Sequence, residues 1–225
     1  MVAAAAGVPR GFCDIGEYMD NLISRRSLLV SAFALASTPS AKALRAEGTR
    51  ATESVVLVTT LGNISLSVDR RAPRSAASFL EYADRHLLDG TQFYRSVHPE
   101  NDSNPVKISV LQGGMTDRTH ALPPIPHEST QQTGLRHSDG AISIARRELG
   151  TGIGGIFFIC IGDQPELDFG GRRNPDGQGF AVFGRVNQGM DIVRKIWGQP
   201  TVGTDGSIAA QRISSPVDIL SVVRK

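Results

Sequence analysis

The chain has 225 residues, 40% of them hydrophobic, which is enough for one sizeable core and gives no reason to expect a second domain. The formal net charge of +2 is far below that of proteins that bind by neutralising phosphates, so nucleic acid is not an expected partner. The two cysteines, Cys13 and Cys160, lie in a candidate leader and in an apolar strand, so no disulfide is expected.

Residues 1–43 have the features of an export leader. Arg25-Arg26 form a twin-arginine pattern, and Ala41-Lys42-Ala43 is a cleavage candidate. The apolar stretch between them is about ten residues long, whereas a membrane anchor, the alternative interpretation, needs about 20. The pattern predicts a bacterial protein exported to the periplasm by the twin-arginine route. Residues 44–225 would then be the mature domain, with no stable membrane insertion after cleavage.

The mature part begins with a predicted hairpin followed by a helix. Ser54–Thr60 and Asn63–Val68 alternate β-branched and polar residues around Leu61-Gly62, a pattern typical of paired strands. From Pro73 to Leu88, apolar residues recur at spacings of three and four, which predicts a helix that ends at Asp89-Gly90.

Six further strands and a second helix are expected in the rest of the chain. The helix spans Gln188 to Trp197, and two long segments, Thr116–Ser138 and Gln164–Gly179, are predicted loops that carry function or border a site. Short strands separated by Gly, Pro, Asn and Asp clusters favour a closed antiparallel barrel. The six strands are Gln92–Val97, Lys107–Gln112, Gly140–Ala145, Ile156–Ile161, Phe180–Val186 and Val217–Val223.

Three of these strands carry residues that together predict a peptide-binding site. They contain the motifs Phe93-Tyr94-Arg95, Gln112-Gly113-Gly114 and Phe157-Phe158-Ile159-Cys160. A guanidinium and a carboxamide on neighbouring strands can grip a peptide backbone, while a phenylalanine lines a pocket for a small ring. Taken alone, Arg95 would more often be a surface ion-pair residue, and Gln112 a simple strand end.

Two other patterns superficially resemble metal or cofactor sites. His127-Glu128 lacks a second histidine at helical spacing, so no metal is expected. The glycine-rich run from Gly150 to Gly155 lacks the strand-helix-strand context of a dinucleotide loop, so no cofactor is expected either.

With these motifs in place, the chain resembles the cyclophilins, a family of peptidyl-prolyl cis/trans isomerases, from Glu53 to Val223. The resemblance implies a mainly β fold, an eight-stranded closed antiparallel barrel capped by two α-helices. It also implies that Arg95 is the catalytic arginine and that Gln112 is the catalytic glutamine that holds the substrate backbone. Phe158 takes the place of the floor of the proline pocket, and Leu167 that of one wall.

Several expected substrate-binding positions differ from the commonest eukaryotic members of that family. Val110 stands in place of a methionine, Arg146 in place of an asparagine that meets the substrate backbone, and Phe180 in place of a histidine. Ser109 replaces a phenylalanine and Ile156 a glutamine. The pocket therefore matches the family less closely than the barrel does.

The resemblance implies an enzyme that accelerates X-Pro bond rotation in folding proteins. It would act as a monomer on proline-containing polypeptides, without cofactor or metal. The alternative is a peptide-binding chaperone or scaffold on the same barrel, with little catalysis because Ser109, Arg146 and Ile156 have changed the groove. An insertion from Pro99 to Pro105, relative to short members of the family, adds a further difference.

Overall fold

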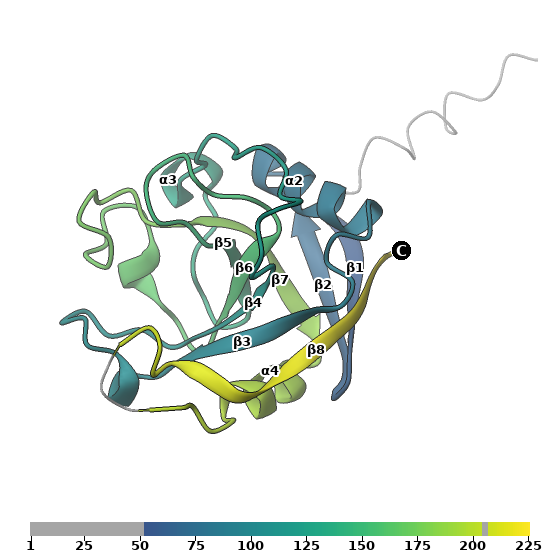
Figure 1. Cartoon of the computed structure of the whole chain (residues 1–225). Coiled ribbons are helices and arrows are strands. Elements are labelled where there is room, and N and C mark those ends of the chain that lie inside the picture. The colour runs from purple at the N-terminus through teal and green to yellow at the C-terminus, as the bar shows by residue number, and fades with distance from the viewer. Residues whose placement is uncertain (1–51, 204–206) are drawn as a thin grey trace, which may run out of the picture. The chain divides into compact units, whose positions relative to one another are not determined.

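The computed structural model describes residues 52–203 and 207–225, so the predicted leader lies outside the described residues (Figure 1). The described part contains eight strands and three α-helices. In chain order these are β1 (Thr52–Thr59), β2 (Gly62–Asp69), α2 (Pro73–Asp84), β3 (Thr91–Val97), β4 (Val110–Gly114), α3 (Thr130–Thr133), β5 (Ala141–Ile144), β6 (Ile156–Cys160), β7 (Ala181–Gln188), α4 (Met190–Trp197) and β8 (Arg212–Arg224).

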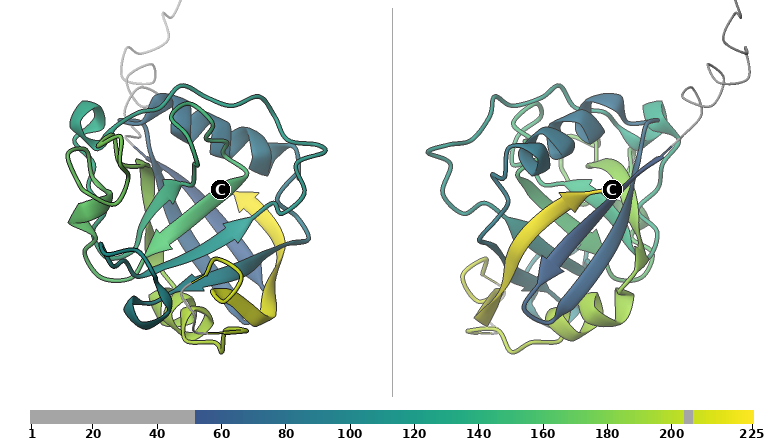
Figure 2. Two further views of the ribbon diagram at one scale, coloured as in Figure 1. Left: turned by 60° about the vertical axis from the view of Figure 1, so that its left-hand side comes forward. Right: turned by 90° about the vertical axis from the view of Figure 1, so that its right-hand side faces the viewer.

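The strands close into an antiparallel barrel in the order β1-β2-β7-β5-β6-β4-β3-β8. Because β8 pairs with both β1 and β3, no strand edge is left open. Helices α2 and α4 lie at opposite ends of the barrel (Figures 1 and 2). The predicted mainly β barrel with two capping helices is therefore confirmed, and the single turn α3 is an addition to it.

Aromatic side chains fill the barrel below α2. Phe79 of α2 meets Phe157 of β6 edge-on, with ring centroids 5.7 Å apart, and packs on Phe183 of β7 at 4.9 Å. Phe93 of β3 meets Phe157 edge-on at 6.0 Å. All four rings are fully buried. Edge-to-face contacts of this kind add to the free energy gained by burial, so α2 is fixed to the barrel by its own phenylalanine.

The helices are shorter than their apolar patterns predicted. Helix α2 ends at Asp84, because the backbone at His86 turns into the left-handed region with φ of 57°. Leu88 lies beyond this turn but is fully buried, which explains why the apolar spacing continued past the helix end. Helix α4 begins at Met190 because Gly189 precedes it with φ of +92°.

The long loop between β4 and β5 is fixed to the start of α2 by one buried carboxylate. Glu128 accepts hydrogen bonds from the backbone N–H of Arg74 (3.1 Å) and Ser75 (2.7 Å), and from the Ser75 hydroxyl (2.7 Å). It thus satisfies N–H groups that the first turn of a helix leaves without partners. The predicted loop from 116 to 138 is therefore held against the barrel on the side of α2.

Candidate functional site

A cleft of about 590 Å³ opens on the faces of β3, β4 and β6 that point away from the barrel interior. Strand alternation separates the two faces, since Leu111 and Phe157 are fully buried in the core while Gln112 and Phe158 line the cleft. All seven residues predicted for the site line this cleft, namely Arg95, Val110, Gln112, Arg146, Phe158, Leu167 and Phe180.

The strand register places the three central residues in one row. Arg95 pairs with Gln112 across β3 and β4, and Gln112 pairs with Phe158 across β4 and β6. Directly opposite residues share a face of the sheet, so the guanidinium, the carboxamide and the ring lie side by side. Within the row, Arg95 Nη1 donates to Gln112 Oε1 at 2.7 Å.

An irregularity in β3 brings two consecutive residues to the cleft. Phe93 pairs with Gly113 and Arg95 pairs with Gln112, so Tyr94 is an extra residue with no counterpart on β4. In a regular strand Tyr94 and Arg95 would point to opposite faces, but at this bulge both line the cleft while Phe93 stays in the core. Tyr94 then accepts a hydrogen bond from Gln112 Nε2 at 3.0 Å.

The guanidinium of Arg95 is held by two neutral carboxamides. Besides Gln112, it contacts Gln211, whose Oε1 accepts from Arg95 Nε at 2.9 Å and from Nη2 at 2.5 Å. Three of the five guanidinium N–H groups are thus used, which leaves two for a ligand. Burial, and then the positive charge of Arg173, lower the pKa of Arg95, although an arginine stays protonated in proteins.

Gln211 was not among the residues predicted for the site. Its side chain is 1% exposed, and its Nε2 donates to the carbonyl of Asn101 at 2.8 Å, which fixes the direction in which Oε1 points. In sequence it lies 116 residues after Arg95 and outside every predicted strand and helix, where no local pattern indicates it.

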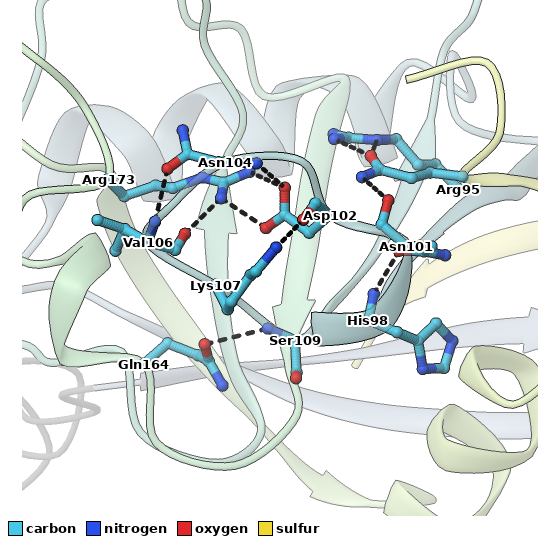
Figure 3. A network of polar contacts seen from close by, with 11 residues as sticks. Arg95, His98, Asn101, Asp102, Asn104, Val106, Lys107, Ser109, Gln164 and Arg173 are labelled. Atoms are coloured by element: carbon cyan, nitrogen blue, oxygen red, sulfur yellow. Dashed lines mark hydrogen bonds and ion pairs between the residues drawn. The ribbon is translucent and has the colours of Figure 1, made fainter. Parts of the chain in front are cut away.

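Arg173 lines the cleft next to Arg95 and forms a buried ion pair with Asp102, which lies outside the cleft (Figure 3). Arg173 donates to both carboxylate oxygens of Asp102, at 2.6 and 3.2 Å, and to the carbonyl of Val106 at 2.6 Å. The side chains are 12% and 3% exposed, respectively. Lys107 donates to the backbone carbonyl of Asp102. The predicted insertion from Pro99 to Pro105, which carries Asp102, therefore supports the cleft through Arg173 without lining it.

The apolar part of the cleft is built around Phe158. This ring is 4% exposed and meets Phe180 edge-on with centroids 5.2 Å apart, while Leu167 is fully buried next to them. The backbone N–H of Phe180 donates to the Leu167 carbonyl at 2.9 Å, which joins the two loop residues. Val110 completes the lining from β4. The arrangement can hold a small apolar ring beside Arg95.

Arg146 borders the cleft, but most of its donors are used inside the protein. It donates to both carboxylate oxygens of Asp176, at 2.8 and 2.9 Å, and twice to the carbonyl of Gly179. This pairing lowers the pKa of Asp176 to about 2. The Arg146 Cζ lies 5.5 Å from the centroid of the Phe180 ring, so the arginine supports that wall of the pocket from one side.

A buried polar chain supports Phe158 from behind. The His137 ring stacks on Phe158 with centroids 5.9 Å apart, and His137 Nδ1 lies 2.8 Å from Asp168 Oδ1. Burial lowers the pKa of His137, so the neutral ring donates from Nδ1 and accepts at Nε2 from the Ser143 hydroxyl at 3.0 Å. The order Ser-His-Asp is that of a hydrolase triad, but Ser143 is fully buried and no substrate can reach it.

In the described part of the chain, no three His, Cys, Asp or Glu side chains gather in a way that could hold a metal ion. The same residues include no helix with the length and hydrophobicity that a bilayer-spanning segment requires.

Comparison with known proteins gives consistent matches. Residues 54–224 match the family model described as cyclophilin type peptidyl-prolyl cis-trans isomerase/CLD. A peptidyl-prolyl cis-trans isomerase of Acinetobacter baylyi is 31% identical over 200 residues, which cover 87% of this chain and 89% of the relative. Peptidyl-prolyl cis-trans isomerase A of Dickeya dadantii is 34% identical over 146 residues, covering 63% and 70%.

Solved structures show the same fold. A cyclophilin type peptidyl-prolyl cis-trans isomerase of Cryptosporidium parvum, determined in the presence of the dipeptide Ala-Pro, superposes with a TM-score of 0.60. The match covers 76% of this chain and 98% of that protein, at 16% sequence identity.

Proposed function

We propose, from the premise that this chain belongs to the cyclophilin-type peptidyl-prolyl cis-trans isomerase family, that the cleft around Arg95, Gln112 and Phe158 is its active site. The protein is an enzyme that accelerates rotation about X-Pro bonds. Its substrates are proline-containing polypeptides, and the proline ring enters the pocket formed by Phe158, Leu167 and Phe180.

The reaction needs no bond to be made or broken. The barrier to rotation is close to 20 kcal/mol because the amide nitrogen shares its lone pair with the carbonyl, and the uncatalysed exchange takes about 10 to 100 s. In the twisted state the proline nitrogen regains its lone pair and becomes a hydrogen-bond acceptor. A catalyst therefore has to donate a hydrogen bond to that nitrogen more strongly in the twisted state than in either planar state.

Arg95 meets this requirement. Its two remaining N–H groups carry a charge that neither Gln112 nor Gln211 neutralises, and they lie beside the apolar pocket. This unneutralised charge next to an apolar pocket is the observation that carries the proposal. An acceleration of about 10⁵ requires roughly 7 kcal/mol, which a fixed charge-assisted hydrogen bond and an anchored ring can together supply.

Gln112 holds the substrate backbone beside the proline. Its carboxamide is fixed between Arg95 and Tyr94 by hydrogen bonds of 2.7 and 3.0 Å, so it meets the substrate backbone in one orientation. With the proline side of the amide held by Phe158 and Gln112, the carbonyl side turns while the proline side stays in place.

The test is the exchange rate of an Ala-Pro peptide, measured by NMR with residues 44–225. Arg95→Ala should lower kcat/KM by about a hundredfold, as expected for the loss of one preorganised donor. Arg185→Ala, an exposed arginine of β7 outside the cleft, is the matched control and should leave the rate unchanged. Unchanged catalysis in Arg95→Ala would remove this residue from the mechanism, and binding without rate enhancement by the wild type would favour a peptide-binding scaffold.

Export to the periplasm, as a monomer, is the second part of the proposal. It is supported by the Arg25-Arg26 pair, the short apolar stretch and the cleavage candidate at Ala43. Expression of the full chain in a bacterium should give a periplasmic product that begins at Leu44 and elutes as a monomer. Replacing Arg25 and Arg26 with lysine should hold it in the cytoplasm, and a full-length cytoplasmic product from the wild type would refute export.

A further inference from the structure

The mouth of the cleft is rich in arginine. Six arginines line it, whereas no aspartate or glutamate of the described residues does. They come from segments that are distant in sequence, between β4 and β5, between β5 and β6, between β6 and β7, and from β3 and β8. The six are Arg95, Arg118, Arg146, Arg147, Arg173 and Arg212.

Two of these arginines are neutralised by carboxylates and a third is held by carboxamides. Arg146 pairs with Asp176, and Arg173 pairs with Asp102. Arg95 is used by the reaction. The charges of Arg146 and Arg173 are thus largely compensated within the protein, so neither is available as a free cation for a bound peptide.

The other three arginines, Arg118, Arg147 and Arg212, are exposed and have no side-chain hydrogen bond or ion pair with any described residue. Two carboxylates are near them in sequence, Asp117 and Glu148, but neither lines the cleft. Asp117 instead accepts hydrogen bonds from the backbone N–H and hydroxyl of its neighbour Thr119, at 2.9 and 2.6 Å. Among the described residues, nothing compensates these three positive charges, which a peptide in the cleft therefore faces.

We propose that the preferred substrates are X-Pro segments flanked by aspartate or glutamate, and that Arg118, Arg147 and Arg212 select them. This inference rests on the proposed isomerase function and names its substrate class. The cleft is large enough for several residues of an extended peptide, so acidic side chains on either side of the proline reach its rim. The net charge of only +2 keeps this positive potential local, which favours a short acidic peptide over a long polyanion.

Each exposed ion pair of this kind raises affinity by about 1.4-fold to fivefold. Three such pairs together predict a preference of about tenfold at low ionic strength. Because the pairs are exposed to solvent, salt screens them, and the preference should nearly vanish at about 0.5 M salt. Attraction between opposite charges also speeds association, so the gain should appear mainly in kcat/KM.

The experiment compares two capped hexapeptides, Glu-Glu-Ala-Pro-Phe-Glu and Gln-Gln-Ala-Pro-Phe-Gln, by NMR exchange with residues 44–225. The wild type should isomerise the glutamate peptide with about tenfold higher kcat/KM at low salt. In the triple variant Arg118→Gln, Arg147→Gln and Arg212→Gln, the ratio between the two peptides should fall to about one. Arg185→Gln removes one exposed arginine outside the cleft and should keep the wild-type ratio.

The outcomes separate this inference from the proposed function. Equal kcat/KM for the two peptides with the wild type would overturn the acidic preference while leaving the isomerase intact. A preference that persists in the triple variant would overturn the assignment to these arginines. If neither peptide exchanged faster than without enzyme, the isomerase function itself would fail.

Discussion

Arg95 and Gln211 are joined by two hydrogen bonds to a single carbonyl oxygen across 116 residues of sequence. Gln211 does not line the cleft, so it acts on the reaction through the arginine that it holds. Two N–H groups of one guanidinium that share a fixed acceptor oxygen restrict both its position and its plane. Gln211 is therefore a positioning residue for the proposed catalytic group.

Removing this contact should slow the reaction without weakening substrate binding. We expect Gln211→Met, which keeps the side-chain volume but removes the acceptor, to lower kcat about tenfold, since hydrogen bonds to charged groups contribute about 1.5 to 3 kcal/mol. KM should change little. Peptide exchange measured over a range of substrate concentrations separates the two constants. Gln188→Met, at an exposed position of β7, is the control, and an unchanged kcat in Gln211→Met would contradict the role.

Phe158, at the floor of the pocket, should affect substrate binding and stability rather than kcat. Phe158→Ala removes a ring that is 4% exposed, so we expect a loss of about 3 to 5 kcal/mol in the free energy of unfolding and a higher KM. Phe158→Leu keeps much of the volume and should lose less of both. Urea unfolding and the exchange assay measure the two effects. A normal KM in a folded Phe158→Ala protein would show that the proline ring binds elsewhere.

Replacing one partner of the buried Asp102–Arg173 pair should lower the free energy of unfolding far more than replacing both partners. Asp102→Asn leaves the Arg173 charge without a carboxylate partner at 12% exposure, so the free energy of unfolding should fall by about 3 to 5 kcal/mol. The double variant Asp102→Asn, Arg173→Met removes both charges and should regain most of that loss. Denaturant unfolding of Asp102→Asn, Arg173→Met and the double variant gives the coupling energy. Equal losses in Asp102→Asn and the double variant would mean that the unpaired Arg173 charge carries no penalty of its own, which would contradict the prediction.

Stability should fall as the pH is lowered below about 6.5. Burial lowers the pKa of His137 in the folded protein, whereas the unfolded chain takes up its proton near pH 6.5. Below that pH the unfolded state binds a proton that the folded state does not, so the free energy of unfolding decreases until the lowered pKa is reached. The lowered pKa of Asp168 acts in a more acidic range, below about 3.8.

Thermal unfolding between about pH 7.5 and pH 5 tests this dependence. His127 also has a pKa lowered by burial and contributes in the same direction, so His127→Gln and His137→Gln should be compared. Each should flatten the pH dependence relative to the wild type. If the melting temperature of His137→Gln falls with decreasing pH as steeply as that of the wild type, the His137 ring is not the group responsible.

The barrel was predictable because its strands follow local rules of alternation, but their ends were not. The strand expected from Lys107 begins at Val110, because the Ser109 N–H donates to the side chain of Gln164 (3.1 Å) instead of to a neighbouring strand. The last strand starts at Arg212, five residues earlier than expected, and continues through Pro216. A hydrogen bond to a side chain from a distant loop cannot be predicted from the local sequence.

The part of the site that lies on neighbouring strands was predictable from the sequence. Arg95, Gln112 and Phe158 were recognised through motifs, and strand pairing brings them into one row. Their roles in catalysis remain predictions. Gln211 was missed, and so was the pairing of Asp102 with Arg173, because these partners lie 116 and 71 residues apart and only the folded chain brings them together.

The place of β8 has a consequence for when the enzyme becomes active. This strand closes the barrel between β1 and β3, and the residue just before it is Gln211. The guanidinium of Arg95 is synthesised long before Gln211, and its two hydrogen bonds to that side chain form only once the chain next to the last strand has docked. A nascent or truncated chain that lacks β8 would have the arginine without this support and without a closed barrel, so full turnover reports that folding is complete.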